Sequence, residues 1–99
     1  MDYLFVSSEE ITFLKSLGLN KKELGYYNDN LFIKGITYSQ VFDWIRQQYN
    51  FTFYIHESAY YKTYYAITID DKAFEIIEDD WNYCEKFMLE LLIEKIKKL

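Results

Sequence analysis

The sequence contains no proline, a single cysteine, a single histidine and only three glycines among its 99 residues. One cysteine excludes an internal disulfide, and no stretch has the pattern of a secretion signal, so we expect a cytoplasmic protein. Because no proline, repeat or low-complexity run marks a linker, we expect one domain over residues 1–99. Gly18, Gly25 and Gly35 fit neither the phosphate-binding loop nor the dinucleotide-binding glycine pattern.

Positive charge is also scarce. The 11 lysine and arginine residues are outnumbered by 16 acidic residues, which gives a net charge of −5. Affinity for long nucleic acid depends on basic side chains that neutralise phosphates, so this balance argues against such a ligand. Apolar runs are only a few residues long, as at Leu91–Ile93, so we expect no membrane-spanning segment.

Residues that commonly bind metals or act as nucleophiles are few and far apart. His56 and Cys84 fall on different predicted elements and lack the spacing of a metal site, and Cys84 fits a buried apolar role. Six acidic residues between positions 70 and 80 lack the alternating oxygen ligands and central glycine of a calcium loop. We therefore expect no metal, no cofactor and no enzymatic activity.

Two segments carry complete helix start signals. Ser7 can cap a first helix while Glu10, three residues later, reaches back to close a capping box, and Gly18 ends that helix. Thr37 and Gln40 repeat the same pattern for a second helix that runs to about residue 49.

The last predicted helix follows the acidic residues 78–80 and ends among the lysines at 95–98, an arrangement that suits the helix dipole. Its predicted core stripe consists of Trp81, Cys84, Met88, Leu91 and Leu92. A second apolar stripe lies about a quarter-turn away and consists of Leu89, Ile93 and Ile96. Because a small monomer would expose this second stripe, we predict that it forms the interface of a homo-oligomer.

Tyrosine is abundant, with 11 residues, and it is densest between Tyr49 and Ile69. From Phe51 onward the hydrophobic pattern changes to period two, which predicts an antiparallel hairpin with an aliphatic core face. The predicted core residues are Phe53, Ile55, Ile67 and Ile69. On the opposite face we predict a ligand-binding set that consists of Tyr54, His56, Tyr60, Lys62 and Tyr64. Two other interpretations stay open for this face: a scaffold of cross-strand pairs, or a surface covered by a partner subunit.

The order of these elements defines the expected fold class. A first hairpin is predicted from Gly25 to Lys34, with a turn over Asn28, Asp29 and Asn30, and a third strand is predicted over 73–77. Helices thus alternate with consecutive hairpins, so we predict an α+β fold in which about three helices pack mainly on one face of an antiparallel sheet.

Five stretches of the sequence together resemble one protein family. They are SSEEITFLKSLG, GYY, TYSQVFDWIRQQYNF, YYKTYYAITI and YCEKFMLELLIEKI. In this order they resemble small proteins of phages and prophage-like regions in Bacteroides-type bacteria, and the segment from Thr37 to Tyr49, with Trp44 at its centre, is the most specific. Members of that family often carry proline at the position of Ile36. The resemblance implies a viral accessory protein that acts in the cytoplasm of the host bacterium, and it carries over no catalytic residues.

Three functions are compatible with these observations. The first is a non-catalytic counter-defence protein that sequesters a small nucleotide-type immune signal in an aromatic pocket, as an oligomer. The second is a protein–protein inhibitor of a host defence effector, such as a CRISPR complex, that uses an acidic and tyrosine-rich surface. The third is a small enzyme, which the lack of a catalytic motif disfavours.

Overall fold

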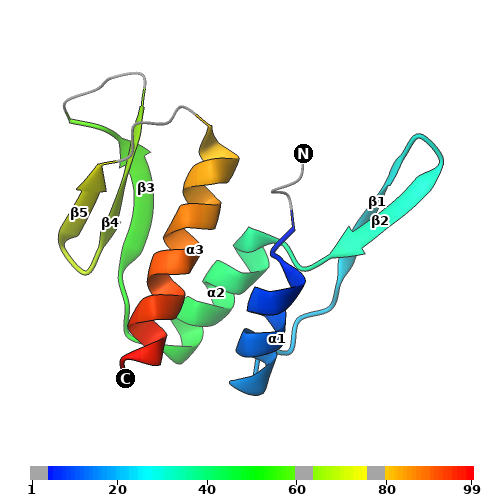
Figure 1. Ribbon diagram of the computed structural model, residues 1–99, viewed down its shortest axis with the longest axis horizontal. Coiled ribbons are helices and arrows are strands. Elements are labelled where there is room, and N and C mark those ends of the chain that lie inside the picture. The colour runs from blue at the N-terminus through cyan, green and yellow to red at the C-terminus, as the bar shows by residue number, and fades with distance from the viewer. Residues whose placement is uncertain (1–4, 60–63, 76–79) are drawn as a thin grey trace. The chain divides into compact units, whose positions relative to one another are not determined.

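The computed structural model describes residues 5–59, 64–75 and 80–99 (Figure 1). In chain order its elements are α1 (Ser8–Ser16), β1 (Leu24–Asn28), β2 (Leu31–Gly35), α2 (Tyr38–Gln48), β3 (Phe53–Glu57), β4 (Tyr65–Ile69), β5 (Lys72–Glu75) and α3 (Trp81–Lys97). All strand pairs are antiparallel, which confirms the predicted α+β class. The strands in the described residues form two sheets rather than the single predicted one. The chain divides into two compact units, Met1–Gln47 and Gln48–Leu99.

Both predicted capping pairs interact in the first unit, and the pair at α2 forms a complete capping box. At α1 the Glu10 N–H donates to the Ser7 hydroxyl over 3.3 Å, and that hydroxyl donates to the Glu10 carboxylate over 2.9 Å. At α2 the Gln40 N–H donates to Thr37 Oγ1, and the Thr37 N–H donates to Gln40 Oε1 over 2.9 Å. The pair at α1 satisfies one N–H group and the box at α2 satisfies two, so both helix starts follow directly from sequence.

The first unit also contains the β1–β2 hairpin, which is a two-stranded sheet of its own. A two-residue turn joins the strands, and both of its residues, Asp29 and Asn30, have positive φ values of 50° and 67°. This is the geometry of a type I′ turn, which matches the right-handed twist of the strands. The turn sets the register and places Tyr27 opposite Phe32, with ring centroids 5.1 Å apart.

The base of this hairpin is held by the segment that precedes α1. The Val6 N–H donates to the Ile36 carbonyl over 2.8 Å, and Phe5 forms an isolated bridge with Thr37. The Phe5 ring lies against Gly35, where a Cβ atom would be only 2.8 Å from it. Glycine at position 35 therefore gives the ring the space that it occupies.

The second unit contains a three-stranded sheet in the order β3-β4-β5. Phe53 pairs with Ile69, and Ile55 pairs with Ile67, so the predicted core residues share one face. Phe53, Ile67 and Ile69 are buried, which confirms that part of the prediction, and Ile55 is half-buried. A second type I′ turn joins β4 to β5.

Helix α3 packs against β4 (Figure 1), and its start is capped by the Asp80 carboxylate, which accepts from the Asn82 N–H. The buried residues of α3 are Cys84, Met88, Leu89, Leu92, Ile93 and Ile96. Two predictions about its core stripe were wrong. Leu91 is half-exposed, and Trp81 at the first turn is 47% exposed, with its ring meeting that of Tyr65 edge-on at 5.4 Å.

The other tryptophan, Trp44 on α2, is buried. Val41 and Ile45 on the same helix are completely buried, so α2 has an apolar face. Among the helices of the described residues, none is long and apolar enough to cross a membrane.

Candidate functional sites

The sheet face that bears Tyr54 was predicted to bind a ligand. Tyr54 pairs with Thr68 across the strands and its side chain is exposed, with 54% of its surface accessible. Its ring centroid lies 5.2 Å from that of His56, two residues along the same strand. Tyr54 therefore offers an accessible aromatic plane, as the period-two pattern predicted.

His56 has partners within its own sheet. Its Nε2 atom lies 2.9 Å from the Thr68 hydroxyl, and its Nδ1 atom lies 2.8 Å from the carbonyl of Glu57. With both ring nitrogens within hydrogen-bonding distance of protein groups, the imidazole can stabilise the hairpin without a ligand.

Ser58 and Glu75 form a second polar contact in this sheet. Ser58 is buried, its hydroxyl donates to the Glu75 carboxylate, and its N–H donates to the carbonyl of Tyr64 over 2.9 Å. Tyr64 is half-buried and precedes β4. Tyr60 and Lys62, the other two predicted ligand-binding residues, lie outside the described residues. Tyr54 is thus the one large exposed ring on the described part of this face.

The second apolar stripe of α3, which was predicted to form an oligomer interface, is buried within the chain. Leu89, Ile93 and Ile96 are at most 7% exposed, so they do not form the accessible stripe that the prediction required. Helix α3 buries two adjacent stripes instead of one, and the sequence pattern could not show which of its apolar residues stay outside. These three side chains are therefore not accessible to a partner subunit.

The concave feature of the second unit lies elsewhere, where the β4–β5 turn and β5 face the C-terminal half of α3. This α3–β5 cavity has a volume of about 440 Å³. Its lining consists of Ile69, Asp70, Lys72, Phe74, Leu91, Glu94, Lys95 and Lys98. The lining thus contains three apolar side chains, three lysines and two carboxylates. Its net charge is +1, whereas the net charge of the chain is −5.

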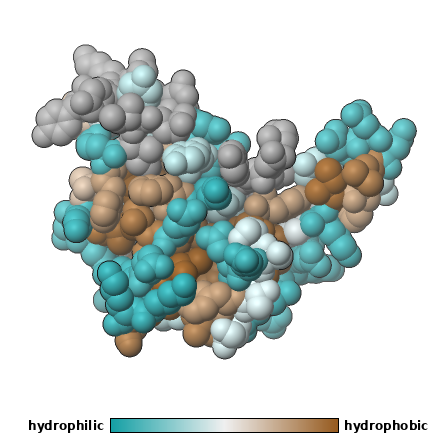
Figure 2. All heavy atoms as spheres, in the orientation of Figure 1, coloured by the Kyte–Doolittle hydropathy of each residue, from teal (hydrophilic) through white to brown (hydrophobic). Residues whose placement is uncertain are grey.

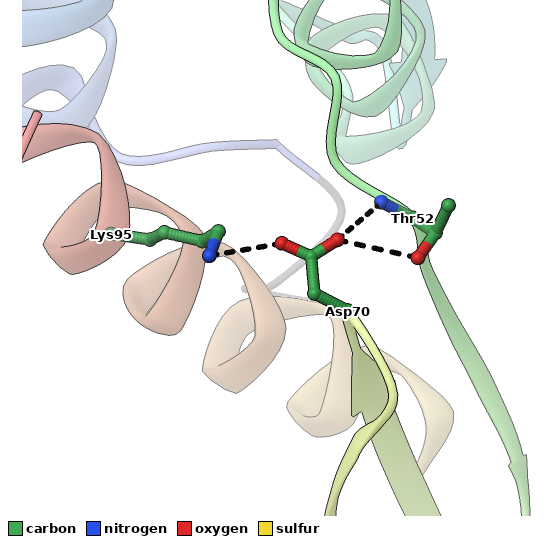
Figure 3. Close-up of polar contacts among 3 residues, drawn as sticks. All are labelled: Thr52, Asp70 and Lys95. Carbon is green, nitrogen blue, oxygen red and sulfur yellow. Dashed lines mark hydrogen bonds and ion pairs between the residues drawn. The ribbon is translucent and has the colours of Figure 1, made fainter.

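One wall of the cavity is fixed by Asp70 (Figure 3). Its Oδ1 atom accepts from the Thr52 N–H over 2.8 Å and from the Thr52 hydroxyl over 3.3 Å, while its Oδ2 atom lies 2.9 Å from Lys95 Nζ. The hydrogen bond from the Thr52 backbone, followed by that from Lys95, holds the pKa of Asp70 below its ordinary value. The Lys95 ammonium also lies 4.9 Å from the centre of the Phe51 ring, so both an ion pair and a cation–π contact hold this side chain in place.

Two other lysines of the lining have no carboxylate partner in the described residues. The Lys72 ammonium lies 5.3 Å from the centre of the Phe74 ring, and Lys98 follows the last turn of α3. Both are exposed, whereas Phe74 is half-buried. An anion in this cavity would therefore meet two available ammonium groups beside an aromatic surface.

No motif in the sequence predicted this cavity. No protein family, curated protein or solved structure matches the chain. The family resemblance and its functional implications therefore stay predictions. Cys84 is buried, and no group of three or more potential metal ligands occurs among the described residues.

Proposed function

We propose that this chain is a non-catalytic binding protein that holds a small, ring-bearing anion in the α3–β5 cavity. The observation that carries the proposal is that Lys72 and Lys98, which have no carboxylate partner within the part of the chain that the structure describes, line the same cavity as the half-buried Phe74 ring. In the biological role that the sequence predicts, the ligand is a nucleotide-type immune signal, and binding withdraws it from the host defence.

The dimensions support a ligand of this class. Cavities that bind small molecules usually measure roughly 300–1,000 Å³, and a mononucleotide or one half of a dinucleotide fits the lower part of that range. The cavity of about 440 Å³ offers an apolar floor made by Ile69, Phe74 and Leu91. An aromatic base can rest on this floor because every base has a flat apolar face.

The charges support one or two phosphates rather than a polyanion. Lys95 is committed to Asp70, which leaves Lys72 and Lys98 to contact the ligand. Because the Lys72 ammonium already lies over Phe74, a bound ring and its phosphate can reach the aromatic surface and the positive charge together. Glu94, at the rim, disfavours ligands with a larger number of negative charges.

A calorimetric titration with cyclic dinucleotides, cyclic trinucleotides and ADP-ribose tests the proposal, preceded by a thermal-shift screen of the same compounds. A ligand that binds the native state raises the melting temperature, and the rise grows with the logarithm of the ligand concentration above the dissociation constant. We expect Phe74→Ala to weaken the ligand by about ten- to hundredfold, the usual value of a stacked ring. Lys98→Ala should weaken it by about two- to fivefold, because the lysine is exposed.

Lys22→Ala is the control, since it removes the same charge from an exposed side chain that does not line the cavity. Tyr54→Ala tests the rival site on the outer face of the sheet. A ligand that is lost with Tyr54→Ala and kept with Phe74→Ala would place the site on the outer face and refute the cavity. If no compound binds, the protein–protein inhibitor becomes the better proposal.

Sequestration also differs from catalysis in its product. The bound ligand should return unchanged when the complex is denatured and separated by chromatography. Recovery of a cleaved nucleotide would contradict the non-catalytic proposal and would indicate a small enzyme.

A further inference from the structure

The β1–β2 hairpin carries the largest exposed apolar surface of the first unit. Its exposed side chains are Leu24 (51%), Tyr27 (77%), Leu31 (65%) and Phe32 (52%). Figure 2 shows hydrophobic residues at the surface of this hairpin. An isolated two-stranded hairpin is only marginally stable in water, and an apolar patch of this kind usually marks an interaction site.

Only the base of the hairpin is supported by its own unit. The Phe5 ring lies 5.9 Å from that of Tyr26 and against Gly35, and Tyr26 and Ile33 are half-buried. The half toward the turn lacks such cover, because Tyr27 and Phe32 contact each other and stay exposed. A strand added from another chain would therefore bury the most apolar surface at this half of the hairpin.

The edge of β1 is open and uncharged. Within the described residues β1 pairs only with β2, and its sequence from Leu24 to Asn28 contains no charged residue. Natural edge strands are commonly protected by lysine or proline, and β2 has such a residue in Lys34. The two edges of the hairpin therefore differ in charge, and the uncharged edge of β1 is better suited to pair with an added strand.

The turn fixes which backbone groups this edge presents. A two-residue turn makes Asn28 and Leu31 a pair that exchanges both ladder hydrogen bonds, and such pairs alternate along an antiparallel ladder. Gly25 and Tyr27 therefore direct their N–H and C=O groups away from β2. These two residues are symmetrically placed about Tyr26.

We propose that β1 pairs antiparallel with β1 of a second copy of this chain, with a two-fold axis at Tyr26. Gly25 of each copy then lies opposite Tyr27 of the other, and the outward backbone groups of both residues are satisfied. The product is a four-stranded sheet in the order β2-β1-β1-β2 across the two copies. It is an isologous interface, the kind that closes on itself and does not form a filament.

The side chains favour this register. A Cβ atom at Gly25 would collide with the Phe32 ring, so that ring already lies over Gly25 on the face that also bears Tyr27. In the paired sheet, Tyr27 of one copy lies opposite Gly25 of the other and next to the Phe32 ring there. Two separate exposed aromatic pairs become one four-ring cluster, and cross-strand aromatic contacts of this kind stabilise sheets.

Charge also favours a second copy. At roughly 200 Å² for a large side chain, the exposed fractions of Tyr27 and Phe32 amount to about 260 Å² per copy, or about 500 Å² for a pair, so we expect a weak dimer in which the ladder hydrogen bonds contribute alongside the aromatic cluster. Two chains of net charge −5 repel each other, so they meet at the lowest cost where the surface is uncharged. The β1 edge meets that condition.

Sedimentation velocity over a micromolar to millimolar concentration series, with Tyr27→Lys and Leu31→Lys, tests the proposal. Both residues are strongly exposed, so neither change opens a core cavity, and both add the same charge. Tyr27→Lys should raise the dimer dissociation constant at least tenfold. Leu31→Lys should leave it nearly unchanged, because Leu31 lies on the outer strand and on the opposite face. Circular dichroism verifies that both variants are folded.

Amide hydrogen exchange gives a second readout that depends on the register. The amides of Gly25 and Tyr27 should become protected as concentration rises, while those of Tyr26 and Asn28 should be protected at every concentration. A wild-type chain that stays monomeric, or a dimer that Tyr27→Lys and Leu31→Lys weaken equally, would overturn the proposal. A monomer whose hairpin is covered only by another protein would overturn it too. None of these outcomes bears on ligand binding in the α3–β5 cavity.

Discussion

Substitution of two neighbouring leucines on α3 tests the observed core most directly. Leu89 is completely buried, whereas Leu91 is half-exposed at the α3–β5 cavity. A buried Leu→Ala change costs about 2–5 kcal/mol because it loses apolar contact and leaves a cavity. We therefore expect Leu89→Ala to lower the free energy of unfolding by about 3 kcal/mol. Leu91→Ala, at a side chain that is already partly in contact with water and leaves no enclosed cavity, should cost about 1 kcal/mol.

Urea denaturation followed by circular dichroism measures this difference. At a slope of about 2 kcal/mol per molar urea, the midpoint should fall by about 1.5 M for Leu89→Ala and by about 0.5 M for Leu91→Ala, with the slope unchanged. The two variants remove the same atoms from the same helix, so each serves as the control of the other. A larger loss for Leu91→Ala would restore the sequence-based assignment, in which Leu91 belongs to the core and Leu89 to an interface, and would refute the packing described above.

Three further predictions concern single side chains. Trp44→Ala should cost about 3–5 kcal/mol and Trp81→Ala clearly less, because only Trp44 is buried; equal midpoints in urea would contradict this. Asp70→Asn should lower the melting temperature at neutral pH. Because the folded-state pKa of Asp70 lies below its ordinary value of 3.8, this difference should persist above that pH and disappear as the pH falls through the folded-state pKa. Burial raises the pKa of Glu85, so ionisation there opposes folding, and the stabilisation present below pH 4.5 is lost as the pH rises through the folded-state pKa. Glu85→Gln should therefore melt higher than wild type at pH 7 and equally at low pH.

Local signals explain how much of the fold the sequence predicted. The capping pairs at Ser7 and Thr37 are made by neighbouring residues, so their chemistry is readable without any knowledge of tertiary structure. The faces of β3 and β4 follow from the two-residue period of a strand in the same way. Asp and Asn at the first turn indicated a tight connection because both residue types tolerate positive φ.

The wrong predictions concern residues whose burial depends on tertiary packing. Helix α3 carries apolar residues around much of its circumference, and periodicity cannot tell which of them the neighbouring elements cover. The sequence pattern assigned Leu91 to the core and Leu89 to an interface, and the packing of the helix in the structure reverses which of the two is fully buried. The α3–β5 cavity combines residues 69–74 with residues 91–98, and no short motif links these two segments. Its lysines could not have been grouped before the fold was known.

The connectivity of the sheets has a consequence for how the chain folds. In residues 5–59, 64–75 and 80–99, each ladder between named strands joins strands that are consecutive in sequence, and two of these three ladders close through two-residue turns. Contacts of such short range favour rapid folding, and a chain without proline has no slow prolyl isomerisation step. The first unit can therefore fold on the ribosome while the second is still being made. The β3-β4-β5 sheet, by contrast, has to wait for α3, which follows it in the chain, before Ile67 and Ile69 are covered. During that interval the apolar sheet face and its open edges can associate with other chains, so translation of the last helix is the step at which aggregation competes with folding.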